Sequence, residues 1–152
     1  MTILAAYKPS PEGRAVLETA VAEARLRNAD LLVVRHVRRK GCQYLTPPAL
    51  HHSSGESPQL DEESGQPVDK LRIELDSLSR AINQQGVKCE SVLMDQGDDH
   101  AAPILTLASR MSVELIVVGI RRRSPVGKAV IGSESQKLLL NADCPVLAVK
   151  AD

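Results

Sequence analysis

The sequence predicts a doubly wound α/β fold, a single domain with a five-stranded parallel sheet in the order 3-2-1-4-5 and helices on both faces. Two observations predict it. Short runs of Val, Leu and Ile recur without alternating with polar residues, as in strands that are buried on both faces. Segments with apolar residues at helical spacing lie between these runs, which gives the order βαβαβαβαβ. The 152 residues suffice for one such domain, spanning residues 1–152.

Five apolar runs are the expected strands. Neighbouring parallel strands need a long crossover connection, and each segment between the runs is long enough to contain a helix. Ligands of such sheets bind beyond the carboxyl ends of the strands, so the residues that directly follow the runs are the candidates for function. The runs are residues 3–6, 31–34, 92–94, 115–118 and 146–149.

Two expected helices flank the second strand. The first follows Ser10, a good capping residue, and Pro11, which suits a first turn. The second stops at Gly86. Their apolar stripes are Val16, Leu17, Ala20, Val21 and Ala24 in the first helix, and Leu71, Leu75, Leu78 and Ile82 in the second.

Two further expected helices flank the fourth strand. Asp98 or Asp99 can start the earlier one. The later one runs from Ser133 to about residue 141, and Ser133 and Gln136 have the spacing of a capping box. The stripe of the earlier helix is Ile104, Leu105, Ala108 and Met111.

Residues 38–67 form the one irregular segment, "RRKGCQYLTPPALHHSSGESPQLDEESGQP". This segment is rich in Pro, Ser and Gly and buries little apolar surface to offset the entropy of ordering. We therefore expect a long flexible loop, mobile from about residue 41 to 66, and not a second domain. The acidic stretch "DEES" at 61–64 could fold over neighbouring basic residues, but a free tether is the favoured interpretation.

Composition excludes several classes of protein. With 19 basic and 19 acidic residues the net charge is zero, which gives no general attraction to nucleic acid or membranes. No apolar run reaches the ~18 residues of a membrane span, and "MTILAAYKPS" lacks the features of a signal peptide. Cys42, Cys89 and Cys144 are odd in number and lack CxxC spacing. We expect reduced thiols in a cytoplasmic protein without nucleic-acid or membrane partners.

The stretch "GIRRRSPVGKAVIGSESQ", residues 119–136, is the candidate ligand-binding loop. It is not a Walker loop, because Arg122 stands where that motif needs glycine and Ala129 follows Lys128 where it needs a hydroxyl for Mg²⁺. No GxGxxG follows the first strand either. Gly132 precedes a helix, and free N–H groups at a helix start, approached closely past a glycine, form an anion site.

Gly119, Gly132 and Ser133 have the spacing of the signature G-x-x-G-x9-G-[ST]. With "ILAAYKPSPEGRAVL" at the start, "DQGD" before a helix and "NADCPVLAVK" at the end, the chain resembles the universal stress protein family over all but residues 38–67. The resemblance implies an adenine-nucleotide α-hydrolase-like fold and action by binding and not by turnover. It further implies a site for ATP or AMP, as in some members, and a homodimer through the last strand.

The resemblance also implies a set of ligand-binding residues. Val118 and Gly119 would neighbour base and ribose, Val37 would offer its backbone to adenine, and the start of the last helix would meet phosphate. Two positions depart from the family pattern. Arg122 replaces the second signature glycine, and Lys8 replaces an acidic ribose or metal contact after the first strand, so we expect no Mg²⁺ held by the protein. The full candidate set is Tyr7, Lys8, Val37, Val118, Gly119, Arg122, Gly132, Ser133 and Ser135.

Basic residues follow the first, second and fourth strands, whose ends are neighbours in this topology. Two interpretations stay open: a solvated rim, or a cleft that holds a polyanion by side-chain charge. No catalytic or metal-binding group is expected, because Ser133 lacks a base, His100 reads as part of a helix start, and His51-His52 lack a carboxylate at ligand spacing. The basic residues are Lys8, Arg38, Arg39, Lys40, Arg121, Arg122, Arg123 and Lys128.

Two functions follow from this sequence. The first is a regulator that binds a nucleotide or another phosphorylated anion between the ends of the first and fourth strands. The alternative is a stress-response interaction module without a nucleotide, working through its dimer surface and its long loop. Weak ATP hydrolysis is a third option, disfavoured because Lys8 removes the acid on the metal side.

Overall fold

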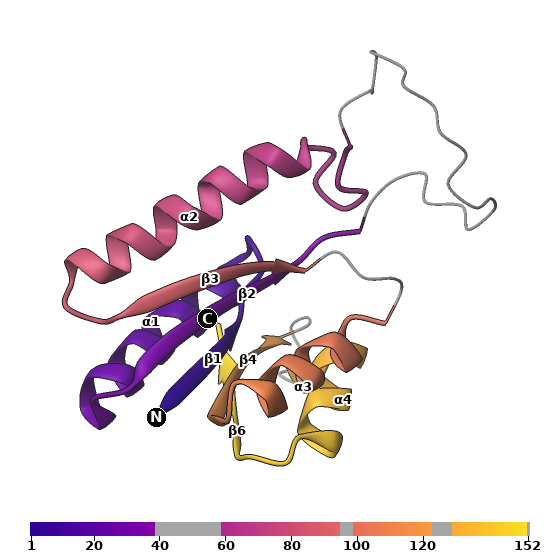
Figure 1. Cartoon of the computed structure of the whole chain (residues 1–152). Coiled ribbons are helices and arrows are strands. Elements are labelled where there is room, and N and C mark those ends of the chain that lie inside the picture. The colour runs from indigo at the N-terminus through magenta and orange to yellow at the C-terminus, as the bar shows by residue number, and fades with distance from the viewer. Residues whose placement is uncertain (39–58, 95–98, 123–128, 152) are drawn as a thin grey trace.

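The structure is a computed structural model that describes residues 1–38, 59–94, 99–122 and 129–151. Its elements alternate as the sequence predicted, with one short extra strand, and Figure 1 shows their arrangement. In chain order they are β1 (Thr2–Ala6), α1 (Pro11–Arg27), β2 (Asp30–His36), α2 (Val68–Gln84), β3 (Cys89–Met94), α3 (Ala101–Arg110), β4 (Val113–Arg122), β5 (Ala129–Val130), α4 (Ser133–Asn141) and β6 (Val146–Lys150).

The parallel strands form a sheet in the order β3-β2-β1-β4-β6. This is the predicted order 3-2-1-4-5, with β6 as the fifth parallel strand. The extra strand β5 pairs antiparallel with the end of β4, Arg121 opposite Val130 and Arg122 opposite Ala129. The sequence predicted a plain loop after Gly119. In the structure β4 continues past that glycine, where Ile120 lies in register with Lys150 of β6.

Helices cover both faces of the sheet, as predicted (Figure 1). One face packs on α1 and α2 through Ile3, Ala5 and Val33, and the other packs on α3 and α4 through Leu4 and Val34. Successive strand residues point to opposite faces. Because both faces are covered, the runs of the inner strands β1, β2 and β4 are buried at every position except Ala6, and these apolar runs are therefore continuous.

The helix starts agree with the sequence in two cases and differ in one. Ser10 caps α1, since its Oγ accepts from the N–H of Gly13 at 3.1 Å. Asp99 serves the start of α3, accepting from the N–H of Ala101 at 3.1 Å, whereas Asp98 lies outside the described residues.

The predicted capping box of α4 is wrong. Gly132 is the N-cap residue, no side chain caps this helix, and Ser133 is already its first helical residue. The first helical hydrogen bond runs from the N–H of Gln136 to the carbonyl of Gly132, at 2.9 Å. A side chain on the first helical residue is past the point from which it could cap the helix.

Residues 59–67 do not form the free tether that we expected. Asp61 is only 3% exposed, and its carboxylate accepts from the N–H of Arg38 at 3.0 Å and from the hydroxyl of Ser64 at 2.7 Å. The N–H of Glu62 also donates to the carbonyl of Arg38, at 2.7 Å. These hydrogen bonds replace the water that would otherwise solvate the carboxylate of Asp61. The prediction of a free tether considered only the apolar residues of the segment and therefore overlooked them. The rest of the expected flexible loop, residues 39–58, lies outside the described residues.

The last strand lies at an edge of the sheet, as predicted, because in the described chain β6 pairs with β4 alone. Its residues Val146, Leu147, Ala148 and Val149 are half-buried. None of the helices in the described ranges is long and apolar enough to span a bilayer.

Candidate ligand-binding pocket

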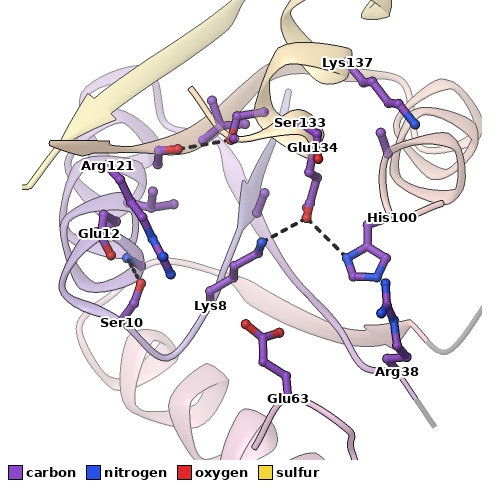
Figure 2. A pocket seen from close by; sticks show the side chains of 18 of the residues that line it. Lys8, Ser10, Glu12, Arg38, Glu63, His100, Arg121, Ser133, Glu134 and Lys137 are labelled. Carbon is purple, nitrogen blue, oxygen red and sulfur yellow. Dashed lines mark hydrogen bonds and ion pairs between the residues drawn. The ribbon is translucent and has the colours of Figure 1, made fainter. Parts of the chain in front are cut away.

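A pocket of about 670 Å³ opens at the carboxyl ends of β1 and β4. The first turns of α1, α3 and α4 and the segment at residues 62–63 complete its wall (Figure 2). Its volume falls in the range of small-molecule sites. Its place, beyond the strand ends and between helices from opposite faces, is the one that doubly wound folds use for ligands.

Two glycines allow the parts of this wall to approach each other. A Cβ on Gly13 would overlap the carbonyl oxygen of Lys8, so only glycine lets the first turn of α1 pack directly against the backbone of Lys8, two residues after β1. A Cβ on Gly119 would lie 3.1 Å from the Cβ of Glu12. These approaches bring the start of α1 and the end of β4 to the same side of the pocket.

The start of α4 presents polar backbone to the pocket. The first N–H groups of a helix have no acceptor within the helix, and the helix dipole makes this end positive. Gly132 has extended backbone with φ −63° and ψ 155°, and a Cβ there would meet nothing within 4 Å. The hydroxyl of Ser135 donates to the carbonyl of Gly119 at 3.1 Å, which ties α4 to the end of β4.

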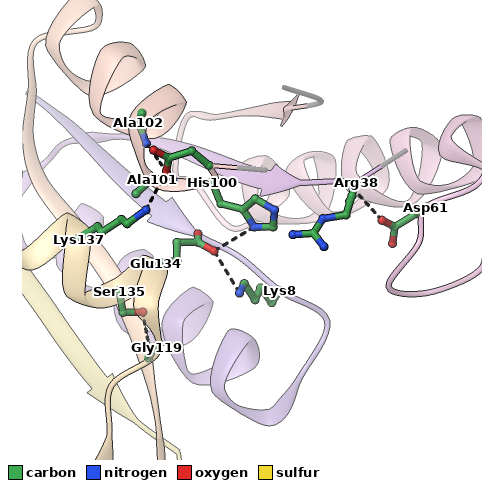
Figure 3. Close-up of polar contacts among 11 residues, drawn as sticks. Lys8, Arg38, Asp61, His100, Ala101, Ala102, Gly119, Glu134, Ser135 and Lys137 are labelled. Atoms are coloured by element: carbon green, nitrogen blue, oxygen red, sulfur yellow. Dashed lines mark hydrogen bonds and ion pairs between the residues drawn. The ribbon is translucent and has the colours of Figure 1, made fainter. Parts of the chain in front are cut away.

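The pocket contains a charge cluster around Glu134, in the first turn of α4 (Figure 3). The Oε2 atom of Glu134 lies 3.1 Å from Nζ of Lys8 and 3.5 Å from Nδ1 of His100. These are ion-pair distances without hydrogen-bond geometry, since no donor among the described residues meets that criterion for Oε2. The ring of His100 stacks on that of His36, with centroids 3.6 Å apart. The cluster thus joins the ends of β1 and β2 to the starts of α3 and α4.

Other cations of the pocket also face carboxylates. Nε of Arg38 lies 3.8 Å from Oε2 of Glu62, and Nζ of Lys137 lies 3.6 Å from Oδ1 of Asp99. The N–H of Ala102, then that of Ala101 and the charge of Lys137, lower the pKa of Asp99. The described part of the basic rim is therefore interleaved with acidic side chains.

Arg121 fits the same pattern on the α1 side of the pocket. The backbone N–H of Glu12 itself and the hydroxyl of Ser10 lower the pKa of the Glu12 carboxyl, and the charge of Arg121 lowers it further. Figure 2 shows the two side chains extending along one another. Lys8, Arg38 and Arg121 thus each have an acidic side chain nearby. Both interpretations of the rim, a solvated edge and a cleft that holds a polyanion, stay predictions. The other rim residues, Arg39, Lys40, Arg123, Lys128 and the side chain of Arg122, lie outside the described part.

Most of the ligand-binding residues named from the sequence meet in this pocket. Two do not line it. Tyr7 packs against the core, and its N–H donates to the carbonyl of Val34 at 2.8 Å. Val37 is 1% exposed, and its N–H donates to Met94, also at 2.8 Å. Those that do line it are Lys8, Val118, Gly119, Gly132, Ser133 and Ser135.

The sequence reasoning missed the carboxylates of the pocket. Glu134 was hidden inside the signature stretch, although an acidic residue in a first helical turn is a recognisable signal for the positive end of a helix. Glu62 and Glu63 belong to the "DEES" stretch that was assigned to a free tether. No group of three or more His, Cys, Asp or Glu side chains in the described chain could hold a metal ion.

The model of the universal stress protein family matches residues 1–150. A universal stress protein of Mycolicibacterium smegmatis is 33% identical over 148 residues, which cover 97% of this chain and 96% of that protein. A universal stress protein from Thermus aquaticus, encoded 3′ of a QAH/OAS sulfhydrylase, is 35% identical over 149 residues, covering 98% of each chain.

Solved structures of universal stress proteins share the fold. One from Archaeoglobus fulgidus has a TM-score of 0.72 at 28% identity and covers 99% of this chain and 98% of its own. Another A. fulgidus structure, in complex with dAMP, has a TM-score of 0.66 at 23% identity with the same coverage. A universal stress protein in complex with cAMP has a TM-score of 0.59 at 15% identity, covering 100% of this chain and 98% of its own.

Proposed function

The chain belongs to the universal stress protein family, and from this we propose that it is a regulatory protein that binds an adenine nucleotide between the ends of β1 and β4. One observation carries the proposal. The pocket lies at the strand ends and is lined by the uncapped start of α4 together with Gly119, Gly132 and Ser133 of the family signature. The dAMP and cAMP complexes of structurally similar proteins support an adenine nucleotide as the ligand.

The roles of the pocket residues follow from their positions. The first N–H groups of α4 would donate to a phosphate, with the exposed hydroxyl of Ser133 beside them. Val118 and Gly119, at the end of β4, would flank the ribose and base. Lys8 and Lys137 would supply positive charge in place of a metal ion, since their ammonium groups lie on the pocket wall.

We expect this protein to act by binding and not by turnover. Lys8 stands where the family pattern has an acidic contact to ribose or metal, and no cluster of potential metal ligands exists among the described side chains. ATP hydrolysis by the purified protein, abolished by Gly132→Val, would contradict this. We also propose a cytoplasmic location, in which cysteines such as Cys89 and Cys144 are kept as free thiols.

Binding can be tested at Gly132. Its backbone is one that any residue adopts and a Cβ there has open space, so Gly132→Val should leave the fold intact. The valine side chain at the N-cap of α4 should block the approach of a phosphate and weaken AMP and ATP binding by at least tenfold, measured by calorimetry. The matched control is Ala22→Val, at an exposed site on α1, with wild-type affinity. Equal affinities in all three proteins would refute the proposed site.

We also propose that the protein is a homodimer that associates through β6. An exposed apolar edge strand must be covered to avoid unspecific pairing. β6 is such a strand, because its apolar residues are only half-buried. Leu140, near the end of α4, is 75% exposed and adds apolar surface. Light scattering at micromolar concentration should give the mass of a dimer, with slow hydrogen exchange of the amides of β6. A monomer mass would contradict the proposal.

A second candidate function, an interaction module without a nucleotide, is favoured by the carboxylates that face Lys8, Arg38 and Arg121. Their presence reduces the attraction of the pocket for phosphate. Arg122→Gly, which restores the family signature, separates the two functions. If neither wild type nor this variant binds any phosphorylated ligand, the nucleotide-binding function is refuted and the interaction module remains. If only the variant binds, Arg122 blocks the pocket of the wild-type protein.

A further inference from the structure

We infer that Glu134 is a specificity-determining residue, which makes this pocket prefer an uncharged nucleoside or a nucleotide with a single negative charge over a nucleoside triphosphate. The inference rests on the proposed function, because it concerns the ligand of the same pocket. Neither the family signature nor the pattern of helices and strands implies this role for Glu134. It depends on where three ionisable side chains meet.

The first argument is the position of Glu134. Its carboxylate belongs to the first turn of α4, where N–H groups and the helix dipole attract a negative charge. The side chain is 15% exposed and lies between Lys8 and His100, at 3.1 and 3.5 Å (Figure 2). Glu134 is thus a built-in anion at the place where the terminal phosphates of a nucleotide would seek N–H groups and positive charge.

The second argument is a carboxylate on the opposite wall. Glu63 lines the pocket from the segment that Asp61 anchors, and Figure 2 shows it directed into the pocket on the side of Lys8 opposite Glu134. Within the described ranges Glu63 takes part in no ion pair. A polyphosphate chain near Lys8 would therefore have a carboxylate on either side of it.

The third argument is the balance of charge among the described residues that line the pocket. Carboxylates outnumber the described cations along its wall, and Lys8, Arg38 and Lys137 each lie within ion-pair distance of one. A triphosphate carries several negative charges and would have to separate such pairs or bring its own cations. The acidic side chains are Glu12, Glu62, Glu63, Asp99 and Glu134, and the basic ones are Lys8, Arg38, Arg121 and Lys137.

A ligand of low charge fits these groups better. Carboxylates accept hydrogen bonds, so Glu63 suits ribose hydroxyls or an amino group. One negative charge can be held by the ammonium of Lys8, which is half-exposed and has N–H donors beyond the one that faces Glu134. The pocket therefore matches a nucleoside or a cyclic phosphodiester.

The test is a comparison of ligands that differ in charge. Calorimetry without Mg²⁺ would measure the binding of adenosine, cyclic AMP and ATP to wild type, to Glu134→Gln and to Glu114→Gln. Glu114 is exposed near the start of β4, far from the carboxyl ends that form the pocket, and serves as the control. Removing one charged contact changes affinity by about tenfold or more.

We expect wild type and Glu114→Gln to bind cyclic AMP at least tenfold more tightly than ATP. Glu134→Gln should lower the ratio of the cyclic AMP affinity to the ATP affinity by about tenfold. It should leave the affinity for adenosine unchanged, because glutamine keeps the shape of the side chain and removes its charge. ATP binding that appears only in Glu134→Gln would support the inference as well. Glu63→Gln should lower the same ratio several-fold, and this variant decides the matter if Glu134→Gln does not fold.

The opposing outcomes are distinct. ATP bound as tightly as cyclic AMP by wild type, with a ratio unchanged in Glu134→Gln, would overturn the selectivity and leave the binding function standing. A ratio of cyclic AMP to ATP affinity that is unchanged in both Glu134→Gln and Glu63→Gln would likewise overturn the selectivity and leave the binding function standing. No binding of any of the three ligands to wild type or to either variant would overturn the binding function together with this inference.

Discussion

At the scale of single residues, the most informative feature is a reversal of charge. The family pattern has an acidic residue after the first strand, and this chain has Lys8, whose ammonium lies 3.1 Å from the carboxylate of Glu134 on α4. A cation introduced at one wall of the pocket thus meets an anion from the other. The pair neutralises the middle of the site, which is the basis of the proposed selectivity for ligands of low charge.

The free energy of this pair can be measured in a double-mutant cycle. Lys8→Met and Glu134→Gln, alone and combined, should show a coupling of at most about 1 kcal/mol in the free energy of unfolding, because the Lys8 side chain is 49% exposed and water screens the attraction. Urea denaturation of the four proteins gives the coupling. A value of several kcal/mol would mean that the pair is far better shielded from water than the structure indicates.

Lys8→Asp tests the chemical meaning of the reversal. An aspartate here would face Glu134, and two neighbouring carboxylates favour Mg²⁺. We expect the variant to bind ATP more weakly than wild type without Mg²⁺ and more tightly with it. Calorimetry with and without Mg²⁺ measures both, and Lys70→Asp, on the exposed side of α2, is the control. An ATP affinity of Lys8→Asp that does not respond to Mg²⁺ would show that position 8 does not face the phosphates.

At the scale of elements, the segment from residue 59 to 67 matters most, because it adds a wall to the pocket. Asp61 holds it in place by accepting hydrogen bonds from the backbone of Arg38 and from Ser64. A bridge between Leu60 and Pro67 closes its base. One buried carboxylate therefore determines where Glu62 and Glu63 lie.

Asp61→Ala should release this segment. Hydrogen bonds to a charged acceptor contribute roughly 1.5–3 kcal/mol each, so we expect a loss of about that size in the free energy of local opening. Hydrogen exchange at the amides of Arg38 and Ser64 should accelerate, while the strands stay protected. Asp143→Ala, at an exposed site, is the control. Unchanged exchange at both amides would show that Asp61 does not anchor the segment.

The same anchor should depend on pH. Burial alone would raise the pKa of Asp61, but the bonds from Ser64 and from the Arg38 N–H outweigh it and lower the pKa below the ordinary 3.8. A lowered pKa means that the contribution to stability is complete above the ordinary value and is lost as the pH falls through the folded value. Exchange at the Arg38 amide, corrected for its intrinsic pH dependence, should therefore show lost protection only below about pH 4. Loss already near pH 6 would indicate that another group is responsible.

At the scale of the whole molecule, the two apolar cores share one sheet. Ile3 and Leu4 are neighbours in β1, yet one belongs to the core under α1 and α2 and the other to the core under α3 and α4. Without Phe or Trp, both cores depend on close packing of aliphatic side chains. Because each strand contributes to both, neither core can be lost while the other persists.

Core truncations on the two faces should therefore have similar effects. Leu75→Ala on α2 and Ile104→Ala on α3 remove side chains that are 3% and 1% exposed, and each should lower the free energy of unfolding by about 2–5 kcal/mol. Circular dichroism and hydrogen exchange should report one transition for both faces. Separate transitions would show that the faces unfold independently.

The sequence by itself determined the order of strands and helices, the sheet order, the edge position of the last strand, and the place of the pocket. These depend on local patterns: continuous apolar runs for strands buried on two faces, helical spacing for the helices, and glycines at strand and helix ends. Ser10 and Asp99 also acted as the sequence indicated, because a cap reaches only two or three residues along the chain.

Only the tertiary structure decided the chemistry of the pocket wall. The contacts of Glu134 with Lys8 and His100, and of Asp61 with Arg38, join residues from different elements, and no local pattern specifies such pairs. The pairing of β5 with β4 and the start of α4 one residue earlier, with Gly132 as its N-cap, are likewise outcomes that the sequence pattern did not specify. Whether a charged residue faces water, a ligand or an opposite charge depends on the distances between side chains, and these distances exist only once the chain has folded.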